Sequence, residues 1–235
     1  MEKFKTLTNK SLGRSAGLFL LTLILLLGGC SKKEHAVEDE RGYCCVNPYP
    51  DVAHVFLVPL DGVSDSRMKE LKQGLKDIFE YNFNCTSDVF EILPRGTSPE
   101  TCMNDLGTRL SAKKMIKFLH TNYADTAKAK TPENAKWYVI GVTDRDIATD
   151  IHGSPDYGIL GLTYLGGTES IISTRRLKNK KDLWKLALHE YCHGFFRSPH
   201  CPKDDPTCIM QDAKGHNPHF EKKNHLCPSC DQILD

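Results

Sequence analysis

The sequence predicts an α+β domain, in which a mixed, twisted sheet with packed helices is followed by one long helix and a small cysteine-rich C-terminal subdomain. Apolar runs typical of strands alternate with amphipathic stretches between residues 52 and 174. Residues 181–196 have the apolar spacing of a largely buried helix, and four cysteines lie between residues 201 and 230. Residues 51–235 are long enough for one domain with its own core.

The expected elements follow from the period of the apolar residues. Residues 64–82 are expected to form a helix because Met68, Leu71, Leu75 and Phe79 recur on one helical face. A second helix is expected at 104–127. Runs rich in β-branched and aromatic residues predict strands at 52–59, 88–93, 137–142, 157–165 and 171–174.

Two short segments have two interpretations each. The glycine-rich segment 158–167 fits either an edge strand that pairs with an extended peptide or a strand with bends and a bulge. Asp144 and Asp146 fit either turn formation or contacts with calcium or substrate, and the turn is the simpler hypothesis.

The long C-terminal helix carries the most informative motif of the chain. His189, Glu190 and His193 form a compact zinc-hydrolase signature, in which two histidines four residues apart share one helical face. Both imidazoles can then reach one Zn²⁺, and the glutamate flanks the remaining coordination position. A five-residue pattern with two free positions also arises by chance.

The residues after this motif extend the pattern. His200 is followed directly by Cys201, then by Cys208, Met210 and a terminal Cys227-Pro228-Ser229-Cys230. This order resembles that of the archaemetzincins, a branch of the metzincin zinc peptidases. Residues 141–147 and 172–177 are also similar to segments of that family, so the resemblance covers approximately residues 51–230.

The resemblance implies a metzincin-like zincin domain that hydrolyses peptide bonds. Glu190 would be the general base that activates a zinc-bound water, and the substrate would be a peptide or protein. Met210 would lie in a tight turn beneath the metal. The catalytic zinc ligands would be His189, His193 and His200, and a second, structural zinc would be bound by Cys201, Cys208, Cys227 and Cys230.

The chain departs from the family pattern after the second histidine. Phe196 occupies the usual glycine position, Gly194 comes two places early, and His200 is one residue late. The glycine normally permits a sharp exit from the helix. We therefore expect either a helix that ends at Gly194 or a bulge near 198–199. The Cys201–Cys208 spacing is also longer than expected, and the Met210–Cys227 spacing differs by one residue.

Several alternatives remain open from sequence alone. The altered spacing is compatible with a catalytically inactive, zinc-stabilised binding lipoprotein on the same fold, or with hydrolysis of another amide in the cell envelope. The four C-terminal cysteines could form two disulfides instead of binding a second zinc. Elsewhere, disulfides are expected between Cys44 or Cys45 and Cys85 or Cys102, with Cys192 buried and free. His216, His219 and His225 are weaker ligand candidates in a polar loop.

The N-terminus predicts the location of the protein. Basic residues precede an apolar run at 17–27, and Leu27-Gly28-Gly29-Cys30 resembles a bacterial lipobox. The run is shorter than the roughly 20 apolar residues of a membrane-spanning helix. Residues 1–30 are therefore expected to be a lipoprotein signal peptide with lipid on Cys30, residues 31–50 a tether, and residues 51–235 the peptidase-like domain.

With such a leader, the protein is expected in the bacterial cell envelope, anchored to a membrane through lipid. Ser31 after the cysteine favours the outer membrane. Four of the 31 basic residues and one of the 30 acidic residues lie within the first 30 positions, so the rest of the chain has a net charge of −2. This balance lacks the basic footprint of a nucleic-acid-binding protein, and no nucleic-acid partner is expected.

Overall fold

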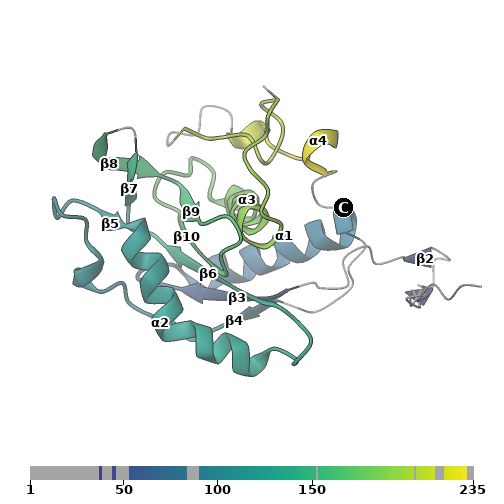
Figure 1. Cartoon of the computed structure of the whole chain (residues 1–235), viewed down its shortest axis with the longest axis horizontal. Helices are drawn as coiled ribbons and strands as arrows, with labels where there is room; N and C mark the ends of the chain where they lie inside the picture. Colours follow the sequence, from purple (N-terminus) through teal and green to yellow (C-terminus); the bar gives the residue numbers. More distant parts are fainter. Residues whose placement is uncertain are drawn as a thin grey trace, which may run out of the picture. The chain divides into compact units, whose positions relative to one another are not determined.

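The structure is a computed structural model, and it describes residues 37–38, 44–45, 53–83, 90–151, 153–203, 205–214 and 220–231 (Figure 1). The chain divides into two units at residues 35 and 36, and the description concerns the second unit. The predicted signal peptide, the lipobox with Cys30, and Cys85, His216 and His219 lie outside the described residues.

A five-stranded sheet forms the centre of the domain, with strand order β4-β3-β6-β10-β9. Strands β3, β4, β6 and β10 pair in parallel, whereas β9 pairs antiparallel with β10 and forms one edge. These strands are β3 (His54–Pro59), β4 (Phe90–Ile92), β6 (Trp137–Thr143), β9 (Gly161–Thr163) and β10 (Glu169–Ser173). The predicted mixed sheet with packed helices is confirmed.

A smaller sheet lies beside the first, with strand order β5-β7-β8. Its strands are β5 (Leu110–Ser111), β7 (Ile147–Ile151) and β8 (Ser154–Ile159). A separate pair of short antiparallel strands, β1 (Val37–Glu38) and β2 (Cys44–Cys45), precedes the domain.

Helices cover both faces of the large sheet (Figure 1). They are α1 (Asp65–Phe83), α2 (Ala112–Lys130), α3 (Leu183–Phe195) and the short α4 (Pro228–Asp231), with 3-10 turns at Glu100–Cys102, Lys180–Asp182 and Phe220–Lys222. Val55 and Leu57 of β3 belong to the core beneath α1 and α3, whereas Phe56 and Val58 belong to the core beneath α2. The strand is apolar throughout because both of its faces are buried.

Two predicted elements differ from the structure. The second helix begins at Ala112 rather than residue 104. Asn104 instead organises a turn, in which its side chain accepts a hydrogen bond from the backbone N–H of Thr108. The side chain of Ser111 caps the helix by accepting from the backbone N–H of Lys114. The predicted strand 157–165 is divided between β8 and β9, which lie in different sheets.

The two aspartates considered for turns or for calcium have partners within the protein. Asp144 accepts from the backbone N–H of Gly62 at 3.2 Å. Asp146 lies between two guanidinium groups, those of Arg109 at 2.7 Å and Arg176 at 2.6 Å. These arginines hold the pKa of Asp146 below its ordinary value, although burial acts in the opposite direction. Asp146 therefore links β7 to the segment after β10.

No helix among the residues with a described structure is long and apolar enough to cross a membrane.

Candidate metal centre

Helix α3 provides a rigid support for the first two histidines. Leu186, Ala187 and Tyr191 are buried in the core beneath the large sheet, so the helix is fixed along its length. Gly194 lies where a Cβ atom would come within 2.5 Å of the Tyr138 hydroxyl oxygen. This glycine permits close packing of the helix on β6 and does not end the helix, which continues to Phe195.

The helix exit accommodates the extra residue before the third histidine. Arg197 has φ = 55°, the left-handed conformation that glycine usually adopts after a helix. The backbone N–H of Ser198 donates to the carbonyl of Cys192 at 3.0 Å, a closure one residue wider than that of the common Schellman motif. Of the two expected alternatives, a helix end at Gly194 is therefore wrong. The added residue is instead absorbed in a wider turn that reaches Ser198, next to the other expected position, a bulge near 198–199.

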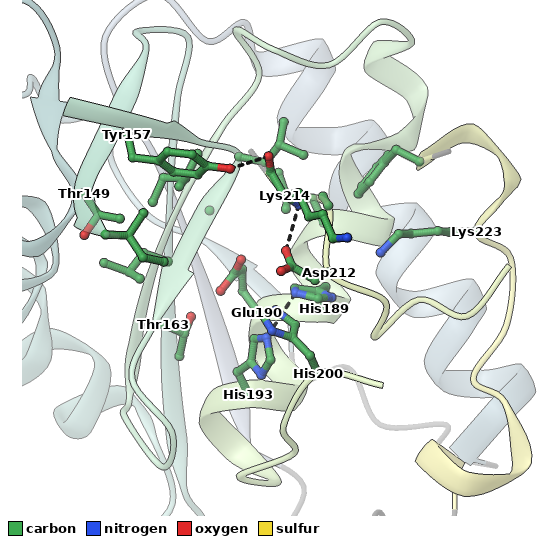
Figure 2. Close-up of a pocket in the computed structure, with 18 residues that line it drawn as sticks. Thr149, Tyr157, Thr163, His189, Glu190, His193, His200, Asp212, Lys214 and Lys223 are labelled. Carbon is green, nitrogen blue, oxygen red and sulfur yellow. Dashed lines mark hydrogen bonds between the residues drawn. The ribbon is translucent and has the colours of Figure 1, made fainter. Parts of the chain in front are cut away.

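The structure brings the three predicted histidines together. One ligand-type atom from each of His189, His193 and His200 lies within 4.8 Å of the others (Figure 2). The Nδ1–H of His189 donates to the carbonyl of Ile209 at 2.8 Å, and the Nδ1–H of His193 donates to the carbonyl of Ser198 at 2.6 Å. These bonds fix the tautomer and leave both Nε2 atoms as acceptors.

The two Nε2 atoms of His189 and His193 are 3.0 Å apart. Two lone pairs at this distance repel each other, and a shared cation would relieve the repulsion. Burial lowers the pKa of His193 to about 4 and that of His189 well below its ordinary value. The imidazoles are consequently neutral near pH 7, as metal ligation requires.

Glu190 lies beside the histidine cluster and beneath the edge strand β9. Burial raises the pKa of its carboxyl group to about 8, although a hydrogen bond with Thr163 acts in the opposite direction. A Cβ atom on Gly161 would come within 2.5 Å of the Oε1 atom of Glu190, so glycine is required at this contact. The Tyr138 hydroxyl donates to the carbonyl of Glu190 at 3.0 Å and holds the helix against β6.

The histidines and Glu190 open into a pocket of about 370 Å³. One wall comes from β7, β8 and β9, and the other comes from the segments around Asp212 and Lys223 (Figure 2). The Tyr157 hydroxyl donates to the carbonyl of Lys214 at 2.6 Å and so connects the two walls. The pocket is therefore a cleft whose two walls are bridged by a hydrogen bond.

Lys223 was not predicted from the sequence. Its side chain is only 3% exposed and lines the pocket, and burial lowers its pKa to about 8. It donates to the carbonyl of Ile209 at 3.1 Å and also to the carbonyl of Gln211. Ile209 thus accepts from both His189 and Lys223. Met210 lies between these two carbonyls, fully buried in a turn closed by the N–H of Gln211 and the carbonyl of Cys208.

The four C-terminal cysteines also converge. The Sγ atoms of Cys201, Cys208, Cys227 and Cys230 all lie within 4.8 Å of one another. All four are free thiols, and the Sγ atoms of Cys201 and Cys227 are 3.7 Å apart. Four thiolates around one zinc at about 2.3 Å would have S···S distances of about 3.8 Å, whereas a disulfide has about 2.05 Å. The geometry fits a shared metal rather than two disulfides.

The remaining candidates lie apart from both clusters. The Nδ1 atom of His225 is 2.7 Å from the Asn224 side-chain oxygen, and this histidine belongs to neither metal group. Cys192 is buried and free, as predicted, and burial raises the pKa of its thiol. Cys102 is a buried free thiol that donates to the carbonyl of Lys114 at 3.7 Å, so the disulfide considered for it is absent.

The α+β fold and the histidine cluster place the domain among proteins with archaemetzincin-like architecture, and solved structures support this fold. An archaemetzincin from Methanopyrus kandleri aligns with a TM-score of 0.58 at 19% identity, covering 80% of this chain and 96% of that structure. A zinc-dependent peptidase from Methanocorpusculum labreanum aligns with a TM-score of 0.61 at 18% identity, covering 77% and 100%. An archaemetzincin from Archaeoglobus fulgidus, complexed with malonate, aligns with a TM-score of 0.54 at 21% identity. The alignment covers 76% of this chain and 98% of that structure.

At the level of sequence, the chain is similar to the archaemetzincin of Haloquadratum walsbyi. It is 30% identical over 110 residues, a match that covers 40% of this chain and 60% of the relative. The chain thus spans less than two thirds of the length of the curated protein that it matches. No family model matches the sequence.

Proposed function

We propose that this chain is a zinc metallopeptidase of archaemetzincin type. The observation that carries the proposal is the convergence of three imidazoles beside one buried glutamate, in the lining of one pocket. The matched proteins are named archaemetzincin or zinc-dependent peptidase, which supports zinc as the metal and a peptide or protein as the substrate.

In the proposed site, His189, His193 and His200 hold the metal. Zinc bound there would act as a Lewis acid and lower the pKa of a water molecule towards neutrality. Glu190 would take the proton from this water and later deliver it to the leaving amine. Its pKa of about 8 applies to the metal-free site, and a nearby dication would favour the charged carboxylate.

Two further features support this reaction: the edge strand β9 and the cluster of four cysteines. The free edge of β9 can pair with an extended peptide, which would place a backbone carbonyl over Glu190. Cys201, Cys208, Cys227 and Cys230 bind a second, structural zinc. The described parts of this segment, residues 201–203, 205–214 and 220–231, contain only short helical turns, so a bound metal would supply the stability that a small core cannot.

Metal analysis of the purified chain tests the proposal. We expect two zinc ions per chain in the unmodified protein and one in the His200→Ala variant, because two histidines hold zinc weakly. Cleavage of a mixed peptide library should disappear together with that zinc. A variant that retains both ions, or an unmodified protein that binds one ion and cleaves no peptide, would contradict the assignment of His200.

We also propose that Cys30 is lipidated and anchors the domain to the envelope. Residues 31–50 would act as a tether that lets the domain reach substrates near the membrane surface. The Cys30→Ala variant should move from the membrane fraction to the soluble fraction of expressing bacteria, because a hydrophobic anchor is lost. A Ser31→Ala variant is the matched control and should remain in the membrane fraction. Equal distribution of Cys30→Ala and the unmodified protein would refute lipidation at this residue.

A further inference from the structure

A buried ammonium group faces the candidate active-site cleft. Lys223 lines the pocket, and its side chain is 3% exposed. Two carbonyls, those of Ile209 and Gln211, accept hydrogen bonds from it. An ammonium group has three N–H donors, and no third acceptor is found among the residues with described positions. Figure 2 shows the Nζ atom pointing from the C-terminal segment towards the cleft.

No salt bridge to Lys223 is found among the residues with described positions, although the carboxylates of Asp212 and Glu190 favour its charged form from a longer distance. Asp212 is exposed, and its carboxylate accepts from the backbone N–H of Lys214 at 2.8 Å. Water therefore screens most of its charge. Glu190 hydrogen-bonds with Thr163 on the opposite wall and is the proposed base. A buried cation is stabilised by a hydrogen-bonded anion, so Lys223 can accept one from a bound molecule.

The position of Lys223 relative to β9 defines which part of a substrate it meets. A peptide that pairs antiparallel with β9 directs its C-terminal half towards the residues before Gly161. Those residues, Ile159 and Leu160, line the same pocket as Lys223. The hydrogen bond from Tyr157 to Lys214 also joins the two walls of this pocket.

From these contacts we infer that Lys223 binds a carboxylate on the C-terminal side of the scissile bond. This inference rests on the proposed peptidase function and names its substrate class. The carboxylate belongs either to the free C-terminus of a short peptide or to an aspartate or glutamate side chain just after the scissile bond. Apolar neighbours such as Leu186 and Phe220 surround the carbon atoms of that residue.

Two pairs of peptides test the inference on the zinc-loaded full chain. The first pair differs only in a free or amidated C-terminus one residue after the cleavage site. The second pair is longer, with both ends blocked, and has glutamate or glutamine at that position. The carboxylate member of at least one pair should have a kcat/KM about tenfold higher or more, since a charge-assisted hydrogen bond provides that much discrimination. The pair that responds identifies the source of the carboxylate.

Two variants assign the preference to a residue. In Lys223→Met, which keeps the length of the side chain, the ratio between the members of the responding pair should fall to near one. In Lys214→Met, which removes the other lysine of the pocket, the ratio should be retained. Loss of the ratio in Lys214→Met alone would overturn the assignment. If Lys223→Met fails to fold or loses zinc, the comparison of peptide pairs in the unmodified chain still decides whether the site recognises a carboxylate.

The outcomes separate the inference from the function on which it rests. Equal cleavage within both pairs overturns carboxylate recognition and leaves the peptidase proposal intact. Cleavage of neither pair, by a chain that carries both zinc ions, overturns the peptidase proposal and the inference with it.

Discussion

Replacing Glu190 with glutamine is expected to reduce kcat for peptide cleavage by about 10²- to 10⁴-fold, the usual contribution of a general acid–base group. The amide has nearly the same shape but cannot take a proton from water. Both zinc ions should remain, because the variant changes no proposed ligand. Burial already favours the neutral form of Glu190, so the amide should fit with little change in stability.

Glu169 provides the matched control. It is also a buried glutamate, 7% exposed, but it pairs with His120 at 2.7 Å and does not line the pocket. Glu169→Gln should retain cleavage within about threefold, because its effects are confined to the sheet. A Glu190→Gln variant that cleaves as fast as Glu169→Gln would show that another group accepts the proton.

Replacing Cys208 with alanine is expected to destabilise the domain by about 4 kcal/mol or more, since loss of a structural metal is among the largest single-residue effects. For a domain of this size the thermal midpoint should fall by roughly 10 °C. One zinc should be lost, as measured by elemental analysis. Cys208 begins the turn that contains Met210, and loss of the metal would loosen this turn, so cleavage should decrease as well.

Cys192→Ala separates the metal effect from the effect of removing a buried sulfur. Cys192 is fully buried in α3 and belongs to neither metal cluster. Its replacement should cost about 1 kcal/mol through a small cavity, with both zinc ions retained. Equal destabilisation of the two variants, without loss of zinc from Cys208→Ala, would contradict a thiolate-bound metal.

Strong periodicity made most of the fold predictable. The helices at 64–82 and 181–196 correspond to α1 and α3 within two residues at each end, because their apolar residues follow the helical period. The convergence of the histidines and of the cysteines was also foreseen from spacing and family resemblance. The sequence shows the order and spacing of such ligands along the chain, whereas the distances between them in space depend on the fold.

The errors arose where tertiary contacts outweigh local pattern. Residues 157–165 form one apolar run, but Leu160 separates β8 from β9 and the chain there changes sheets. The left-handed exit from α3 falls on Arg197, a residue without a turn signature. Lys223 lies in the polar run 221–224, which is typical of a solvated surface. Its burial depends on hydrogen bonds to the carbonyls of Ile209 and Gln211, which lie 14 and 12 residues earlier in the chain.

The two candidate metal clusters are adjacent in the sequence, and this would link their metal binding. His200 and Cys201 are consecutive, and the backbone N–H of Cys201 donates to the carbonyl of Met210 at 2.9 Å. Whatever orders one cluster therefore orders the other. Thermodynamic reciprocity then requires that filling either cluster raises the zinc affinity of its neighbour by the same factor. Zinc uptake by this protein would then be cooperative, and activity would rise more steeply with zinc concentration than it would for independent sites.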